Sequence, residues 1–310
     1  MNKNMKYVHI FFMDGVGMGG TDPAKNPFAT ADLPNLSRLI GRVDWYLLGN
    51  GNISSKRATL IPTDANLGIA GRPQSASGQA TILTGRNVPQ LIGEHYGPKP
   101  NTKVAQVIRQ GTLFHEVVSA GGSAALLTPY PQGYFDAIDS GKRMYSAVPL
   151  TVVSAGLQLF GVEELRQGKA VSPDFTGEGW REFLGYNDIP MISLHDAGRR
   201  IAGIARDYDL SFFEHWPSDR SGHRGPIEDA VAHLEMIDAV IGGLLEIWDD
   251  ASGLLIITSD HGNIEEKDHR RHTRNPVPTI LVGEQHAELA RNICDLSDIA
   301  GIVRQQLEYR

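Results

Sequence analysis

Short apolar runs recur along the chain, and each ends at glycine or at a polar residue. Runs of this length with such flanks predict buried strands. The predicted strands are YVHIFFM from Tyr7, a run after Gly122, a run from Leu210, GLLIIT before Ser259, and VPTILV before Gly283.

The stretches between these runs carry apolar residues three or four positions apart. The clearest case lies between Pro226 and Trp248 and predicts a helix with Pro226 in its first position. DLPNLSRLIG predicts another helix, with Asp32 as N-cap and Gly41 as terminator. Because strands and helices alternate, we expect an α/β fold in which helices cover both faces of a mostly parallel sheet.

Residues 135–190 interrupt this alternation. The segment is rich in turn residues, as in DSGKRMYSAVP and VSPDFTGEGW. We therefore expect a catalytic α/β core formed by residues 1–134 and 191–310, and a small cap formed by residues 135–190.

Composition narrows the functional classes. The chain has 310 residues, which suffice for a full α/β core. Its net charge of −7 argues against a nucleic-acid-binding surface, which needs a basic face. The single cysteine, Cys294, excludes an internal disulfide, and no apolar run approaches the ~18 residues of a membrane span. A cytoplasmic, non-membrane protein is the expectation; the composition does not predict an oligomeric state.

Acidic residues follow three of the predicted strands. They are Asp14, Asp219 and Asp260. Ligands of open α/β sheets bind at the carboxyl ends of the strands, so these acids are expected on one edge. Taken singly, each also fits the role of a turn acid.

Three histidines accompany these acids. His223 lies four residues after Asp219, His261 follows Asp260, and His272 lies in the same loop. Carboxylate and imidazole ligands together can hold divalent cations. The spacing alone does not choose between His272 and its neighbour His269, and solvated loop histidines would look the same.

Ser75 opens a predicted helix after a loop rich in glycine and proline. The free N–H groups and the dipole of a helix N-terminus favour phosphate, although a serine there is often only an N-cap. Three carboxylates facing two dications leave a net positive pocket that attracts an anion. Two metals can stabilise the attacking and leaving oxygens of a displacement, and a coordinated serine becomes a nucleophile.

Four blocks carry a family resemblance. They are MDGVG at residues 13–17, SASGQATILTGR at 75–86, DRSGH at 219–223, and SDHGN at 259–263 followed by HTRNPVP at 272–278. In this order they resemble the alkaline phosphatase superfamily. The nearest branch is the metalloenzyme core of the cofactor-independent phosphoglycerate mutases and phosphopentomutases, and the last block is the most specific match.

The resemblance implies two divalent metal ions, Mn²⁺ or Zn²⁺, and a catalytic serine, Ser75. One metal would be held by Asp219, His223 and His272. The other metal would be held by Asp14, Asp260, His261 and the Ser75 oxygen. The resemblance therefore assigns His272 rather than His269 as the closing ligand.

The chain also departs from the mutase pattern. Mutases have a large second domain, a glutamate after the serine and a histidine four residues after it. This chain has Ala76 and Gln79 at those positions, and about 130 residues between Gly85 and Asp219. We therefore expect a phosphatase or phosphodiesterase that forms a phosphoseryl intermediate and acts on a small phosphorylated substrate, with a phosphomutase as the alternative.

Two other functions rank lower. Sulfatases of the superfamily use a modified residue in a C/S-x-P-x-R context, which SASGQ lacks. A metal-binding protein without turnover is disfavoured because Ser75 occurs with every expected ligand. Substrate contacts are less certain from sequence; Arg86, Asn87 and His95 are the candidates, with Lys99, Lys142, Arg143 and Arg181 as further cations.

Overall fold

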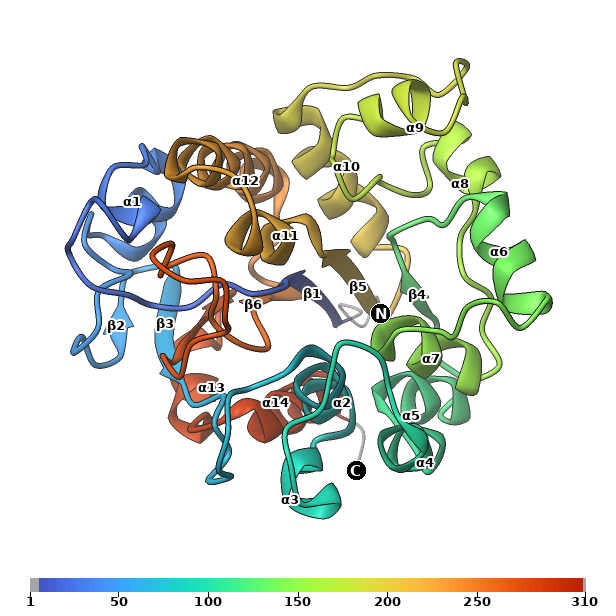
Figure 1. Cartoon of the computed structure of the whole chain (residues 1–310), viewed down its shortest axis with the longest axis horizontal. Coiled ribbons are helices and arrows are strands. Elements are labelled where there is room, and N and C mark those ends of the chain that lie inside the picture. Colours follow the sequence, from blue (N-terminus) through green and yellow to red (C-terminus); the bar gives the residue numbers. More distant parts are fainter. Residues whose placement is uncertain (1–5, 309–310) are drawn as a thin grey trace.

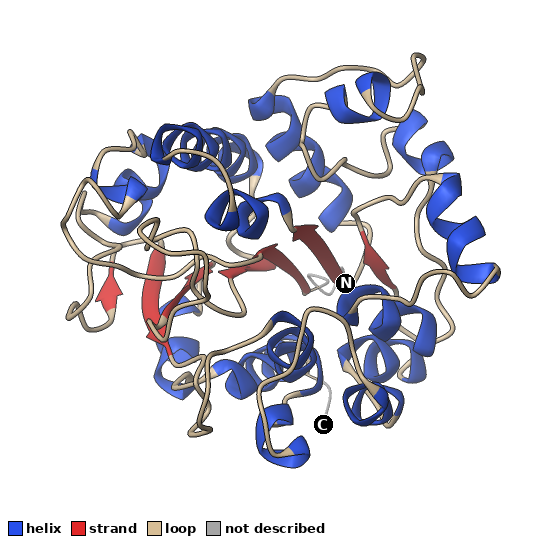
Figure 2. Ribbon diagram, viewed as in Figure 1, coloured by secondary structure: helices blue, strands red, loops and turns tan. Residues whose placement is uncertain are grey.

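A seven-stranded sheet runs through the centre of the molecule, with helices on both sides (Figures 1 and 2). The structure is a computed structural model that describes residues 6–308. The strand order is β2-β3-β7-β6-β1-β5-β4. The strands are β1 (Tyr7–Met13), β2 (Ile53–Ser54), β3 (Ala58–Thr63), β4 (Ala124–Leu126), β5 (Leu210–His215), β6 (Gly253–Thr258) and β7 (Val277–Val282).

The sheet is mixed. β4, β5, β1 and β6 pair in parallel, whereas β7 pairs antiparallel with β6 and β3, and β2 antiparallel with β3. The α/β class is confirmed, and the parallel part contains the strand ends that were expected to hold acids. β2 and β3 lie outside the predicted strands. β3 contains Pro62, which cannot donate to the ladder and lies opposite Pro278.

Side chains of β1 alternate between two hydrophobic cores. Phe11 and Met13 join the core beneath α1, α10 and α12, while Ile10 and Phe12 join the core on the side of α2, α5 and α14. Every residue of β1 is buried, as expected for a strand covered on both faces. The helices of the first group are α1 (Pro34–Ile40), α10 (Leu194–Ala205), α11 (Pro217–His223) and α12 (Ile227–Ile247). Those of the second are α2 (Ser75–Thr84), α3 (Val88–Ile92), α4 (Thr102–Arg109), α5 (Leu113–Ser119), α13 (His286–Leu289) and α14 (Ile299–Leu307).

The start of α1 differs from the prediction. Its N-cap is Leu33 rather than Asp32, and no side chain of its own segment caps it. Instead, the carboxylate of Asp238 on α12 accepts hydrogen bonds from the backbone N–H groups of Asn35 and Leu36, at 3.0 and 2.8 Å. The helix ends as predicted, at Gly41 in the left-handed conformation.

The long helix α12 follows the predicted periodicity. Leu234, Ile241, Leu244 and Trp248 are buried along one side. Pro226 is the N-cap rather than the first helical residue, so the helix begins one position later than predicted, at Ile227. None of the described helices is both long and apolar enough to cross a membrane.

The 135–190 segment is divided between the sheet's helical layer and a small cluster of its own. Its helices are α7 (Ala147–Ser154), α8 (Val162–Arg166), α9 (Glu178–Glu182) and most of α6 (Gln132–Asp139). Val148 and Val152 of α7 belong to the main core beside α2, whereas Leu165, Trp180 and Ile189 form a separate apolar cluster. Its division from the core as a cap stays a prediction.

Candidate metal and nucleophile site

The predicted site residues meet at the carboxyl ends of β1, β5 and β6. Asp14 follows β1, Asp219 and His223 lie on α11 directly after β5, and Asp260 follows β6. Helix α2 points its first residue, Ser75, at the same place. The structure therefore brings together side chains from four separate parts of the chain, as the sheet-edge argument predicts.

Asp219, His223 and His272 form the first set. His223 Nε2 lies 3.3 Å from Asp219 Oδ2, and His272 Nε2 lies 3.6 Å from Asp219 Oδ1. The two imidazole Nε2 atoms are 3.3 Å apart. Three donor atoms of the kinds that bind Mn²⁺ or Zn²⁺ thus converge.

Asp14, Asp260, His261 and Ser75 form the second set. His261 Nε2 lies 3.3 Å from Asp14 Oδ1, 3.7 Å from Asp260 Oδ2 and 3.0 Å from Ser75 Oγ. Among the described residues, Asp14 Oδ1 is buried without a hydrogen-bond partner. A cation held between these oxygens and the imidazole nitrogen would satisfy that atom.

The two sets adjoin through His261. Its ring stacks on His272 with ring centroids 3.7 Å apart. Donor atoms of Asp219, His261 and His272 lie within 4.8 Å of one another, and so do those of Asp14, Asp260 and His261. All seven predicted ligands are thus close together, and the division of ligands between the two metals stays a prediction.

Backbone carbonyls orient two of the imidazoles. His272 Nδ1 donates to Pro73 O at 2.8 Å, and His223 Nδ1 donates to Arg270 O at 2.9 Å. A carbonyl can only accept, so in the neutral rings the Nε2 lone pairs face Asp219 and each other. Lone pairs and carboxylate oxygens repel unless a proton or a metal ion lies between them. The donor set therefore fits a divalent cation, and metal-ligating histidines are commonly oriented in this way.

The carboxylates are strongly perturbed by burial and by one another. Burial, with the negative charge of Asp260, raises the pKa of Asp14 well above its ordinary value. Burial also raises the pKa of Asp260. Burial would raise the pKa of Asp219 too, but the hydrogen bond with His223 and the charge of His261 outweigh it and lower that pKa. Asp14 and Asp260 are close together and buried, which opposes the ionisation of both. A bound dication would stabilise their ionised forms.

The pKa values of His261 and His272 are shifted in opposite directions. Burial opposes the charge of His261, but Asp260 and Asp14 outweigh it and raise its pKa to about 10. Burial and the neighbouring charge of His261 lower the pKa of His272 to about 4. The site thus attracts positive charge at its centre.

Close backbone approaches explain the small residues after Asp14. Gly15 has φ of +71°, and a Cβ there would lie 2.6 Å from Asp219 Oδ1. A Cβ on Gly17 would lie 2.2 Å from Glu265 Oε1. The glycines of MDGVG therefore let the loop pack against the ligand-bearing segments.

Ser75 is the first residue of α2, and Gln74 is its N-cap. The N-cap role that sequence alone allowed for this serine is therefore taken by its neighbour. Ser75 is 7% exposed, so it is largely buried beside the ligand set. Backbone N–H groups at a helix start favour a phosphate beside this hydroxyl.

Three polar residues support the site without having been predicted. Asn263 Nδ2 donates to Asp219 Oδ1 at 2.7 Å. Glu265 accepts from Gly17 N and from Thr273 Oγ1. Lys267 Nζ donates to three carbonyls at the end of α11, Ser221 O, Gly222 O and Arg224 O. Asn263 is the last residue of SDHGN, and Glu265 and Lys267 follow it closely. The density of polar residues in this loop is the sequence signal for them.

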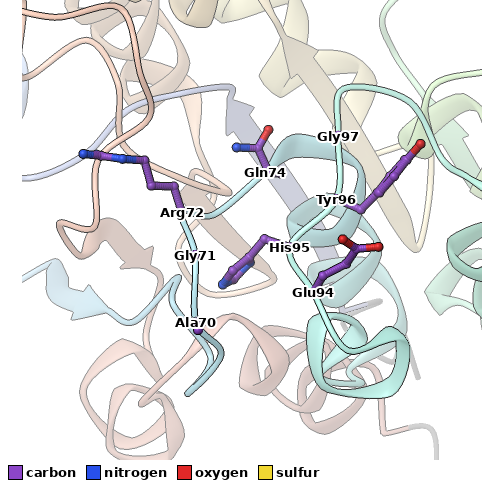
Figure 3. A pocket seen from close by; sticks show the side chains of 8 residues that line it. All are labelled: Ala70, Gly71, Arg72, Gln74, Glu94, His95, Tyr96 and Gly97. Carbon is purple, nitrogen blue, oxygen red and sulfur yellow. The ribbon is translucent and has the colours of Figure 1, made fainter.

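A pocket of about 350 Å³ opens beside the start of α2 (Figure 3). Residues 70–74 and 94–97 line the pocket, and the side chains of His95 and Gln74 face the space between these two segments. The Arg72 side chain extends away from the pocket and donates to His272 O. His95 Nε2 donates to Asn66 O at 3.1 Å, and burial lowers the pKa of His95. His95 thus lines a pocket that also contains Gln74, the residue before the predicted nucleophile.

Arg86 and Asn87 lie at the other end of α2, about 15 Å along the helix axis from Ser75 for a helix of this length. Arg86 Nη1 donates to Gln110 Oε1 at 2.7 Å. Asn87 caps α3, accepting from Gln90 N, and donates to Leu67 O. Both have structural partners away from the site, so neither is retained as a proposed substrate contact.

Other cations and histidines considered from sequence also have partners elsewhere. Arg143 lies over the ring of Tyr134 at 4.7 Å, and Arg181 donates to Ile189 O. His269 Nε2 lies 3.1 Å from Glu266 Oε2. These contacts explain their positions without a ligand.

Glu214, at the end of β5, is a buried acid next to the site. It is 4% exposed, and its Oε2 accepts from the Tyr130 hydroxyl at 2.8 Å. Burial raises its pKa from 4.5 to about 7; the Tyr130 hydrogen bond opposes this and the charge of Asp260 adds to it. The folded protein thus binds a proton here that the unfolded chain releases at lower pH.

The free energy of unfolding of Glu214→Gln, relative to that of the wild type, should therefore be higher at alkaline than at acidic pH. Between pH 4.5 and 7 the unfolded chain ionises first, so the wild type loses up to about 3 kcal/mol of unfolding free energy through this group. The glutamine variant avoids that loss. Urea unfolding of metal-free protein at pH 5 and pH 8 measures it, with exposed Glu182→Gln as control. A difference between Glu214→Gln and wild type that is equal at both pH values contradicts the assignment.

Comparison with known proteins gives a consistent result. Residues 193–309 match the model of the Metalloenzyme superfamily. A 2,3-bisphosphoglycerate-independent phosphoglycerate mutase from Thiobacillus denitrificans is 37% identical over 185 residues, which are 51% of this chain and 36% of that protein. The same enzyme from Dinoroseobacter shibae is 28% identical over 172 residues, 49% and 34% of the two chains. The chain thus spans about a third of these relatives.

Solved structures extend the likeness to the whole fold. Alkaline phosphatase from the Antarctic bacterium TAB5 matches with a TM-score of 0.55 at 12% identity, covering 99% of both chains. The family match covers the part of the chain that carries Asp219, His223, Asp260, His261 and His272. Residues 193–309 thus match a Metalloenzyme-superfamily model, about half of the chain is similar to part of a phosphoglycerate mutase, and the whole chain has an alkaline-phosphatase-like fold.

Proposed function

We propose that this protein is a phosphoryl-transfer enzyme that uses two divalent metal ions and Ser75 as nucleophile, acting on a small phosphorylated substrate. One observation carries the proposal. Ser75 is the first residue of a buried helix, and its Oγ lies 3.0 Å from His261 Nε2, within the second ligand set. A serine placed there would face both the cations and the bound phosphate. Bound Mn²⁺ or Zn²⁺ would supply charge that stabilises the transferring phosphoryl group and favours loss of the serine proton.

The chain's residues would act in a fixed order. Oxygens of the substrate phosphate approach the N-terminus of α2, where the helix dipole favours negative charge. Ser75 Oγ then forms a bond to phosphorus while the bond from phosphorus to the leaving alcohol breaks. The pocket beside His95 has room for the leaving group. A second acceptor then takes the phosphoryl group from Ser75.

Two acceptors are candidates. Transfer to water makes a phosphatase, the function placed first by the sequence. Return to another hydroxyl of the same substrate makes a phosphomutase. The named relatives favour the mutase at least as well, because both are phosphoglycerate mutases. The first step on Ser75 is common to both.

One assay separates these outcomes. The Mn²⁺- or Zn²⁺-loaded protein is incubated with 3-phosphoglycerate, ribose 1-phosphate and p-nitrophenyl phosphate, and both isomers and free phosphate are followed. Interconversion of isomers without phosphate release assigns the mutase, whereas stoichiometric phosphate release assigns the hydrolase. We expect one of these at ordinary enzymatic rates. Absence of both products, together with absence of phosphate on Ser75 by mass spectrometry, refutes the proposal.

A further inference from the structure

Gln79 lies one helical turn below Ser75. It is the fourth residue after the serine in α2, so the two side chains share one face of the helix. The side chain is 3% exposed. A buried amide needs hydrogen-bond partners, and the partners of this one are two of the predicted metal ligands.

The amide nitrogen of Gln79 connects two carboxylates. Nε2 lies 3.3 Å from Asp14 Oδ2 and 3.1 Å from Asp260 Oδ2. An amide nitrogen has two hydrogens, so one can be donated to each acid. Both acceptors are ionised when they bind metal, and hydrogen bonds to charged groups are stronger than those between neutral ones.

These hydrogen bonds fix the orientation of both carboxylates and leave one oxygen of Asp14 for a cation. With Oδ2 of Asp14 held by Gln79, Oδ1 is the atom directed at His261 Nε2, 3.3 Å away. Asp260 is held on both sides, because its Oδ1 accepts from Gly15 N at 3.4 Å. Gln79 therefore restricts the carboxylates of Asp14 and Asp260 to one orientation. Its neutral amide holds these two negatively charged groups next to each other.

We propose that Gln79 is a positioning residue that prepares Asp14 and Asp260 as ligands for the second divalent cation. The inference rests on the proposed function, because it assumes that this ligand set binds metal. Residues that hydrogen-bond to metal ligands commonly change affinity by about 10- to 100-fold when mutated. A positively charged side chain at this position would compete with the cation, and a carboxylate would add a third negative charge.

The direct test is metal binding rather than turnover. Gln79→Met keeps the length of the side chain and removes both donors. Isothermal titration of the metal-free protein with Mn²⁺ should show two sites in the wild type. In Gln79→Met one site should weaken by about 10- to 100-fold, while the other stays within about twofold. Gln90→Met, the same change at an exposed position of α3, is the matched control and should leave both sites unchanged.

A second variant separates hydrogen bonding from packing. Gln79→His keeps one N–H donor, so its weakened affinity should fall between those of the wild type and Gln79→Met. If Gln79→Met does not fold, as judged by circular dichroism, the histidine variant alone must still bind one Mn²⁺ more weakly than the wild type. Equal weakening by the two variants, or no weakening in either, overturns the inference. A wild type that binds fewer than two Mn²⁺ instead refutes the proposed function itself.

Discussion

Ser75→Ala is expected to lower kcat by at least about 1,000-fold, because removal of a catalytic nucleophile leaves only the background supplied by binding and electrostatics. The hydroxyl belongs to one ligand set only, 3.0 Å from His261 Nε2. Mn²⁺ binding to the set that contains Asp219 should therefore remain within about twofold of wild type, because Ser75 is not among the expected ligands of that set.

Steady-state rates on the best substrate, with Mn²⁺ titration of the same preparation, measure both effects. Ser119→Ala is a suitable control, since that serine is exposed at the end of α5. Mass spectrometry after a rapid quench should find phosphate on Ser75 in the wild type and none in the variant. If Ser75→Ala kept a near wild-type kcat, a different nucleophile would have to attack phosphorus, and the proposed mechanism would be wrong.

Removal of divalent cations should abolish activity and also destabilise the fold. Without a cation, Asp14 and Asp260 crowd each other in a buried site, and burial raises the pKa of both. A ligand present at 1,000 times its Kd contributes about 4 kcal/mol per site, which corresponds to a shift in Tm on the order of 10 °C for a chain of this size. Added Mn²⁺ or Zn²⁺ should restore both activity and Tm.

The experiment compares chelator-treated protein, the same protein after metal is returned, and protein exposed to chelator already saturated with the same metal ion. The last sample controls for direct effects of the chelator. Elemental analysis of untreated protein identifies the metal that it carries. A chelated sample that contains no metal yet keeps its rate and its Tm would exclude a metal-dependent enzyme.

How far sequence could predict the fold depends on where each signal lies. β1 and α12 were predictable because their apolar patterns are local and long. The cap of α1 was not, since Asp238 is about 200 residues away from the N–H groups that it satisfies. β3 was not among the predicted strands, and it contains Pro62, which cannot donate to the ladder.

The site shows the same division. Asp14, Ser75 and the other ligands could be found because strand ends and a family resemblance mark them. Gln79 appeared in the sequence only as a departure from the mutase pattern, and its contacts with Asp14 and Asp260 need three-dimensional geometry. Arg86 was named because it ends the helix that begins at Ser75, but the length of α2 separates the two residues in space. Proximity along the chain is therefore a poor guide to substrate contacts in this fold.

The position of β1 has a consequence for biosynthesis. This strand lies between β5 and β6, so its two neighbours are made about 200 and 240 residues later. During translation β1 therefore stays without its neighbouring strands, and its apolar side chains stay unburied, until most of the described chain has left the ribosome. Such exposed hydrophobic segments are prone to association with other chains. We expect the nascent protein to depend on chaperones more than proteins whose first strands form a local hairpin.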